Sequence, residues 1–171
     1  MATSHSNLSS HADRVREAAE SRSGAAASAL VASWRRSLKR YGLEPEEHLG
    51  PDLLTQKALK NAREPLERLL RVAAPSLDRL FGSVGEAGCS VLMSNADGII
   101  LERRGMSGDE AAFRSWGLWE GADWSEAREG TNGIGTCLAE KRPVTIHQDQ
   151  HFHSRNTGMS CIDAPIYDHQ G

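Results

Sequence analysis

The feature that most constrains this chain is a change in the spacing of its apolar residues at Gly85. Before Gly85, apolar residues recur at intervals of three, four and seven, as they do along one side of a helix. After it, they gather in short runs separated by turn residues, as they do in strands. A chain that changes period in this way combines helices with a sheet. The predicted fold class is therefore α/β (α+β), with helices first and an antiparallel sheet flanked by helices after them.

The helical stretch from Leu53 to Val84 has heptad spacing. Its apolar positions are Leu59, Leu66, Leu70, Ala73, Leu77, Leu80 and Val84. This spacing is typical of a helix that packs along a sheet, or against the same helix of a second copy in a dimer, and both can hold at once. Pro65 and Pro75 interrupt the pattern, so we expect breaks or kinks at these positions.

The second half of the chain contains several local signals. Asp97-Gly98 lies between two apolar runs, which predicts a β-hairpin. Further strands are predicted at 143–146 and 161–167. Between them, Thr131 or Asn132 is the predicted N-cap of a short helix. Gly130, Gly133 and Gly135 match no nucleotide-binding fingerprint, so we interpret them as positions of close packing.

The first 64 residues are predicted to form a tail and a helical region. Residues 1–25 are rich in Ala, Ser, His and Arg, which favours a flexible tail or a loose helix. A helix ending at Gly42 follows, with Leu30, Trp34, Leu38 and Tyr41 on one side and Arg35, Arg36, Lys39 and Arg40 on the other. The basic side is interpreted as a solvated face, with phosphate contact as the alternative. The expected division is 1–25, 26–64 and 65–171.

Composition excludes several classes of protein. Among the 171 residues no apolar run is long enough to span a membrane, and the polar N-terminus does not resemble a signal peptide, so a cytoplasmic location is expected. The three cysteines, at 89, 137 and 161, have no paired spacing, which favours reduced thiols. A net charge of −3 argues against a generally basic nucleic-acid binder.

Three tryptophans fall within nine residues of a chain that has few aromatic residues. Trp116, Trp119 and Trp124 either pack in the core or form an aromatic-walled cavity whose indole N–H groups orient a small polar ligand. The two interpretations are equally supported by the sequence.

The His-rich segment at 147–153 offers a second kind of chemistry. His147, Asp149, His151 and His153 are followed by Cys161 and Asp163, and such residue types can bind iron or zinc. No metal signature with fixed spacing is met, so a solvated or hydrogen-bonded loop is the preferred interpretation. Cys137 and Cys161 are the candidate nucleophiles, but no Cys-His-acid triad is recognisable, and no catalytic residue, metal or cofactor is predicted.

Taken together, the motifs resemble a known family. They are Ser33–Ser37, Asp97-Gly98, Gly121–Glu126, Glu129–Thr136, Arg142-Pro143-Val144, His151-Phe152 and Cys161–Ile166. In this order they resemble the N-terminal GAF-type sensor region of sigma-54-dependent transcriptional activators of the acetoin-catabolism type. The resemblance covers about residues 30 to 171. It implies a GAF-like sheet whose last strand is expected to be missing here.

The resemblance implies a non-enzymatic, dimeric sensor of a small-molecule effector, with a helical dimer interface as its output. Contacts with DNA and RNA polymerase would be made by domains that this chain does not contain. The predicted ligand-binding residues are Trp116, Trp119, Trp124, Glu129, Thr131, Asn132, Cys137, His147, His151, Cys161 and Asp163. A metal- or redox-sensing domain built on 147–163 and a ligand-free interaction module are the alternatives.

Overall fold

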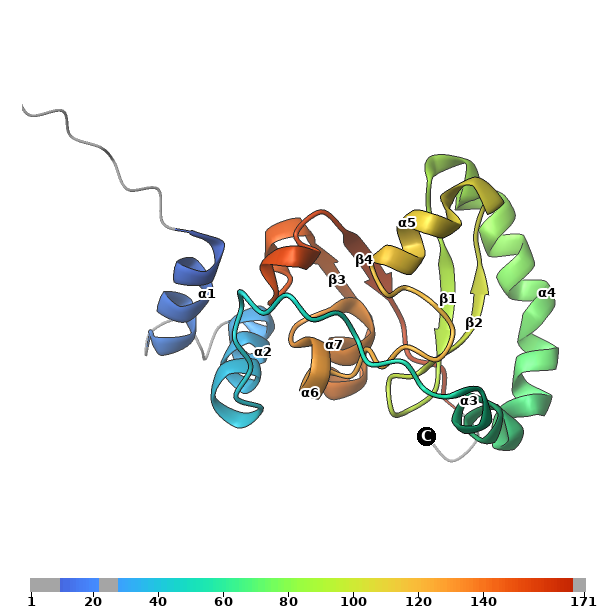
Figure 1. Ribbon diagram of the computed structural model, residues 1–171, viewed down its shortest axis with the longest axis horizontal. Helices are drawn as coiled ribbons and strands as arrows, with labels where there is room; N and C mark the ends of the chain where they lie inside the picture. Colours follow the sequence, from blue (N-terminus) through green and yellow to red (C-terminus); the bar gives the residue numbers. More distant parts are fainter. Residues whose placement is uncertain (1–9, 22–27, 168–171) are drawn as a thin grey trace, which may run out of the picture.

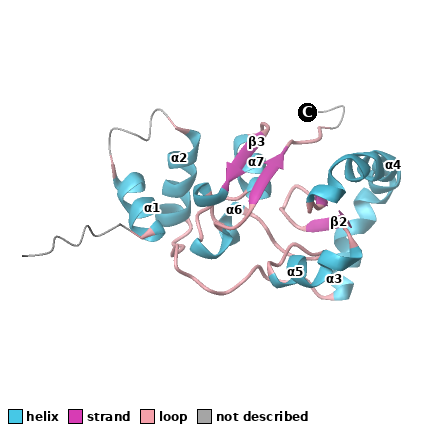
Figure 2. Ribbon diagram, turned by 90° about the horizontal axis from the view of Figure 1, so that it is seen from above, coloured by secondary structure: helices cyan, strands magenta, loops and turns pink. Residues whose placement is uncertain are grey.

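The computed structural model describes residues 10–21 and 28–167, whose elements form three groups along one long axis (Figure 1). The N-terminal helices lie at one end, a hairpin with two short helices lies in the middle, and a second hairpin with a long helix lies at the other end (Figures 1 and 2). Part of the predicted tail lies outside the described residues.

The first group consists of α1 (His11–Glu20), α2 (Ala29–Arg35) and a π-helical continuation, η1 (Arg36–Arg40). Gly42 has a φ of +67°, which ends the helix where the sequence predicts. The segment predicted as a tail or loose helix thus contains α1, which begins with a capping box formed by Ser10 and Asp13. Three of its small apolar residues are fully buried: Ala12, Val15 and Ala19.

The long helical stretch is broken where Pro65 stands. It comprises α3 (Gln56–Arg63), a 3₁₀ turn (Glu64–Leu66) and α4 (Glu67–Val84), which continues through Pro75. Most heptad positions face inward: Leu59, Leu66, Leu70, Ala73 and Leu77 share one core cluster with Met93, Ile99 and Leu101. The packing interpretation of the heptad pattern is therefore confirmed. The same cluster joins α3 to α4, so packing continues across the expected division at 64–65.

The predicted hairpin is present as β1 (Val91–Ser94) paired antiparallel with β2 (Ile100–Arg104). Asn95 closes the turn, because its side-chain Oδ1 accepts hydrogen bonds from the backbone N–H groups of Asp97 and Ile99. Helix α5 (Glu110–Ser115) follows. The segment from Gly121 to Trp124 then returns alongside the start of β2, with Ile100 donating to the carbonyl of Ala122 at 3.0 Å.

The middle group contains α6 (Glu126–Glu129), α7 (Gly133–Glu140), β3 (Val144–His147) and β4 (Ser160–Asp163). β3 and β4 pair antiparallel, and α7 packs on them. Within the described residues each sheet has two strands, so each strand pairs with only one other strand. None of the described helices has the length and apolar content needed to cross a membrane.

Candidate functional site

The three predicted tryptophans lie in three different environments. Trp124 is buried in the core and its indole N–H donates to the carbonyl of Gly117 at 2.8 Å. Trp119 lies beneath the guanidinium groups of Arg103 and Arg114, 4.5 and 3.6 Å from its ring centre. Trp116 is 44% exposed and meets Phe113 edge to face. The core interpretation is confirmed for Trp124, and no ring contact joins any two of the three tryptophans among the described residues.

Six of the predicted site residues gather around the start of α7. Asn132 is the N-cap: its side-chain oxygen accepts from the N–H of Gly135 at 2.8 Å, and its amide donates to the carbonyls of Trp124 and Gly130. The other members of the group are Thr131, Cys137, His151, Cys161 and Asp163, while His147 lies apart, exposed and hydrogen-bonded to Ser160.

The glycines of this region allow close packing, as predicted. A Cβ at Gly133 would meet Asp163 and Cys161, and one at Gly135 would meet the backbone nitrogen of Glu126 at 2.3 Å. Gly130 has a φ of +59° and lies against the ring of Phe152. The backbones of α6 and α7 therefore approach each other closely at Gly135, and side chains of β4 lie against α7 at Gly133.

The half-buried thiol of Cys161 lies in an environment that disfavours its thiolate form. Its sulfur lies 3.5 Å from Nε2 of His151, but burial and the nearby carboxyl of Asp163 raise the pKa of the Cys161 thiol to about 12. Burial also raises the pKa of Asp163 to about 6 and lowers that of His151. The described residues contain no group of three or more His, Cys, Asp or Glu side chains placed to hold a metal ion. The metal- or redox-sensing alternative therefore gains no support from this geometry.

A buried ion-pair network joins the N-terminal helices to α6 and α7. Arg36 donates through Nε to Oε2 of Glu126 at 2.7 Å and through Nη2 to Oε1 at 3.0 Å, and it also pairs with Glu140 at 2.8 Å. The hydroxyls of Ser33 and Thr136 donate to the same carboxylate. These carboxylates raise the pKa of Arg36, which stays charged.

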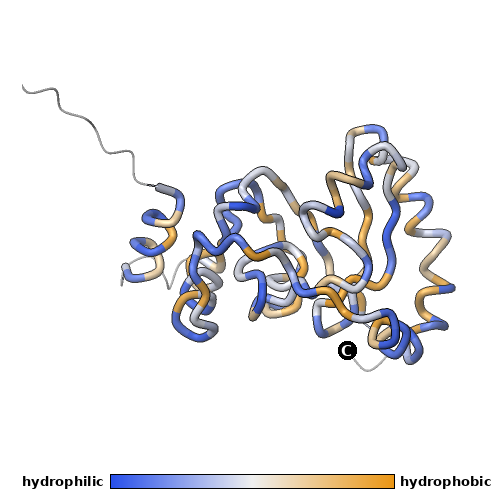
Figure 3. The backbone as a smooth tube through the Cα atoms, viewed as in Figure 1, coloured by the Kyte–Doolittle hydropathy of each residue, from blue (hydrophilic) through white to orange (hydrophobic). Residues whose placement is uncertain are grey.

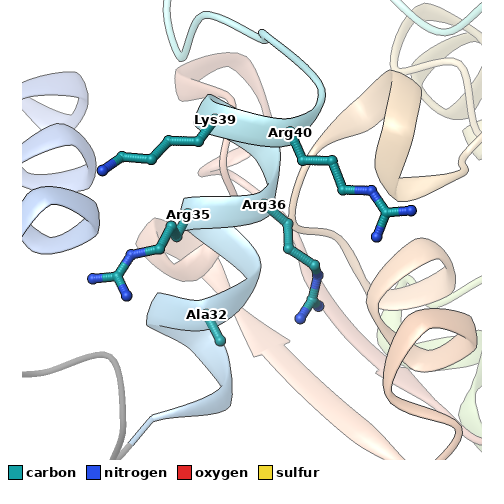
Figure 4. Close-up of a pocket in the computed structure, with 5 residues that line it drawn as sticks. All are labelled: Ala32, Arg35, Arg36, Lys39 and Arg40. Atoms are coloured by element: carbon teal, nitrogen blue, oxygen red, sulfur yellow. The ribbon is translucent and has the colours of Figure 1, made fainter.

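The basic side of α2 and η1 is therefore only partly a solvated face. Arg35 and Lys39 point to one side and Arg36 and Arg40 to the other (Figure 4). Arg35 donates to the carbonyls of Ala19 and Ser21 and so fixes the end of α1. These side chains and Ala32 line a surface hollow of about 370 Å³. Arg35 and Arg36, two of the four basic residues, make hydrogen bonds or ion pairs within the domain. This corrects the expectation that all four face solvent or phosphate.

The second buried carboxyl group, Glu129, faces a cavity. Arg155 Nη2 donates to its Oε2 at 2.5 Å, and Asn156 Nδ2 donates to the same oxygen at 3.4 Å. Burial raises the pKa of Glu129 to about 7 in spite of Arg155. The cavity has a volume of about 80 Å³, and it is lined by Leu43, Glu47, Leu49, Gly50, Asp52, Arg128 and Glu129.

Sequence reasoning missed Glu126, Arg155, Asn156 and the inward role of Arg36. Each is a polar residue whose partner lies from 26 to 93 positions away in the chain. The only available signal for Arg36 and Glu126 was their place in the motifs Ser33–Ser37 and Gly121–Glu126. Spacing alone gives no indication that the two motifs meet.

Comparison with known families decides the assignment. The model of a family described as "MimR, N-terminal domain" matches residues 9–170. This chain belongs to that family. Among its relatives, the acetoin catabolism regulatory protein of Cupriavidus necator is 36% identical to this chain over 139 residues, which cover 81% of this chain and 21% of that protein.

Two further relatives carry related names. The propane 2-monooxygenase operon transcriptional activator MimR of Mycolicibacterium smegmatis is 31% identical over 95% of this chain and 27% of its own length. The acetoin dehydrogenase operon transcriptional activator AcoR of Bacillus subtilis is 30% identical over 83% of this chain and 23% of its own length. This chain thus spans about a quarter of these relatives or less and corresponds to the regulatory N-terminal domain of such activators. None of the three is named as an enzyme, which agrees with the non-enzymatic prediction.

A solved structure confirms the fold class. The crystal structure of the E. coli DhaR(N)–DhaL complex contains a chain that matches 84% of this chain with a TM-score of 0.78, at 18% sequence identity. The match covers 48% of that chain. The mixed helical and antiparallel architecture predicted from the resemblance is therefore shared with an experimentally determined domain.

Proposed function

We propose that this domain binds a small-molecule effector and passes the signal to the rest of a transcriptional activator, a sigma-54-dependent one as the sequence resemblance implies. The relatives support the proposal, because their names refer to the catabolism of acetoin and to a propane 2-monooxygenase operon. Regulators of such operons need a signal that reports a small molecule. The cytoplasm is the compartment in which an activator of this kind acts.

One observation carries the proposal: a single short helix, α6, faces both a cavity and the N-terminal helices. Glu129 at its end lines the cavity, and Glu126 three residues earlier binds Arg36. A ligand that shifts α6 therefore directly changes its contacts with η1 through Arg36 and with α2 through Ser33. An effector can influence the N-terminal helices only to the extent that it binds one position of α6 more tightly than another.

A dimer through α4 belongs to the same proposal. The inward heptad positions are used in the core, but Leu69, Val72 and Leu80 lie on another side of α4 and are 39%, 69% and 52% exposed. Figure 3 shows apolar residues recurring along this helix. An exposed apolar stripe of this kind suits contact with the same stripe of a second copy.

The test is a titration of the purified chain with small ketones, diols and aromatic acids, followed by tryptophan fluorescence and thermal unfolding. Trp34 is a useful reporter because its indole donates to the carbonyl of Gln150 across the junction between α2 and the middle group. A saturable response to one chemical class, with micromolar to millimolar affinity, supports the sensor. Silence with every class contradicts it and favours an interaction module.

A further inference from the structure

Two arginines from different elements lie against one tryptophan ring. The guanidinium carbon of Arg103, on β2, is 4.5 Å from the ring centre of Trp119, and that of Arg114, on α5, is 3.6 Å from it. The guanidinium carbon of Arg103 also lies 5.3 Å from the ring centre of Phe113. Three segments of the chain therefore bring two positive charges to the same place.

Neither arginine has a carboxylate partner within the described residues. The acidic residues next to them in the sequence are bound elsewhere, because Arg63 pairs with Glu120 at 3.1 Å and with Glu102 at 3.8 Å. Glu102 also pairs with Arg104 at 3.0 Å. Two guanidinium groups that share a ring and lack a counter-charge repel each other, and an anion placed beside them removes this cost.

The guanidinium group of Arg103 has hydrogen-bond donors without acceptors. Its Nε and Nη2 are buried, and neither has a hydrogen-bond partner among the residues that the structure describes. An aromatic ring face attracts the charge, but it does not supply the oxygen acceptors that in-plane N–H groups need. A buried donor without an acceptor costs free energy. A small outward turn of the flexible arginine side chain would present these donors to a ligand oxygen.

An exposed aromatic ring lies near the two charges. Trp116 is 44% exposed and meets Phe113 edge to face, with the ring centres 5.7 Å apart. Phe113 is also the ring beside which Arg103 lies. The surface therefore offers an apolar contact close to its unmatched positive charges, which favours a ligand that is anionic at one end and apolar at the other.

We propose that Arg103 and Arg114 bind the carboxylate of a small organic acid whose apolar body lies against Trp116. A guanidinium group matches a carboxylate with two parallel N–H groups, and stacking on Trp119 orients both guanidinium groups. None of these residues lines the cavity beside α6, whose walls come from α6 and the segment 43–52. This site is therefore additional to the proposed effector cavity and does not depend on it.

Calorimetric titration of the whole chain with benzoate, benzamide and inorganic phosphate tests the proposal. Benzoate and benzamide have nearly the same shape, but only benzoate is charged. We expect benzoate to bind about 10-fold or more tightly than benzamide, and to bind more weakly as the salt concentration rises. Phosphate carries the charge without an apolar body, so it should bind more weakly than benzoate.

Substitution of each arginine tests the place of binding. Arg103→Met and Arg114→Met remove one guanidinium group each and keep a long side chain, and each should weaken benzoate binding by about 10-fold or more. Arg142→Met is the matched control, because Arg142 is exposed and its guanidinium group donates to the carbonyl of Pro143. Arg114 is also exposed, so Arg114→Met decides the matter alone if circular dichroism shows that Arg103→Met does not fold.

Each contrary result has its own meaning. Wild-type affinity for benzoate in the folded variants overturns this site. Equal affinity for benzoate and benzamide overturns the requirement for charge, and phosphate that binds as tightly as benzoate overturns the apolar contact. No binding of benzoate by the wild type overturns the inference and leaves the sensor function to its own titration with ketones and diols. An acid that binds Arg114→Met as tightly as it binds the wild type does not occupy this site.

Discussion

Two buried carboxylates of this domain are matched by arginines that lie far away in the sequence. Arg36 neutralises Glu126, and Arg155 neutralises Glu129. His153 is also buried, at 1% exposed, and no ion pair with a carboxylate is present for it among the described residues. Burial lowers the pKa of His153 to about 4, so the ring stays neutral near pH 7. Substitution of Arg36 and protonation of His153 are therefore each expected to lower the stability of the domain.

Loss of Arg36 should destabilise the domain strongly. Arg36→Met leaves the buried carboxylate of Glu126 without its cation, which typically costs about 3 to 5 kcal/mol in the free energy of unfolding. Adding Glu126→Gln to Arg36→Met should recover part of this loss. Arg40→Met, at an exposed position stacked on Tyr41, should cost about 0.5 kcal/mol or less. Urea unfolding measures all three, and equal costs for the substitutions at Arg36 and Arg40 would refute the role of the buried pair.

His153 should make the domain sensitive to acid. Because its folded pKa lies near 4 and its ordinary value is 6.5, the unfolded chain binds more protons in this range. Stability contributed by the neutral ring is therefore complete above about pH 6.5 and is lost as the pH falls towards 4, by on the order of 2 to 3 kcal/mol.

His153→Phe keeps an aromatic ring that cannot be protonated. We expect its unfolding free energy to rise relative to the wild type as the pH is lowered from 7 to 4, as measured by urea unfolding at each pH. His147→Gln, at an exposed histidine, should follow the wild type. A parallel pH profile for His153→Phe and the wild type would contradict the prediction.

At the scale of elements, the sequence was informative wherever a signal is local. The helix end at Gly42, the hairpin at Asp97-Gly98 and the Asn132 cap depend on neighbouring residues, and all three are confirmed. The pairing of Arg36 with Glu126 and the cavity at Glu129 depend on segments that meet only in the folded chain. This is why the predicted site included Glu129 and Asn132 but missed Arg155 and placed Arg36 among outward-facing residues.

The junction of α6 and α7 should tolerate no side chain at Gly135. The Cβ of Gly135→Ala would lie 2.3 Å from the backbone nitrogen of Glu126, so the two helices must separate, at a cost of about 3 kcal/mol or more. Gly82→Ala is a matched control inside α4, where a Cβ meets nothing within 4 Å. It should stabilise the domain by about 0.5 to 1 kcal/mol. Thermal unfolding distinguishes these opposite signs, and a neutral Gly135→Ala would show that the helices are not in close contact.

At the scale of the whole molecule, the domain places its candidate cavity between its N-terminal helices and its long helix. The N-terminal helices meet the middle group through His11, which donates to the carbonyls of His151 and Phe152, and through Arg36. At the opposite end, α4 leaves an apolar stripe exposed. The two ends therefore offer a route for the signal and a surface for a second copy.

The oligomeric state should depend on the stripe of α4. Val72→Glu or Leu80→Glu places a charge on an exposed position, so folding should be preserved while a dimer formed through this surface is lost. Lys57→Glu, on α3, adds an acidic residue outside the stripe and should leave association unchanged. Analytical ultracentrifugation measures the outcome, and dimers that persist in both α4 variants would place the interface elsewhere.

Amide hydrogen exchange with and without saturating effector tests the central claim most directly. The probe is the compound selected by titration, with acetoin tested first. The account predicts slower exchange at 43–52 and in α6, together with a change in α2 that Arg36→Met abolishes or strongly reduces. Protection confined to the tryptophan segment 116–124, with α2 unaffected, would contradict both the place of binding and its coupling to the N-terminal helices.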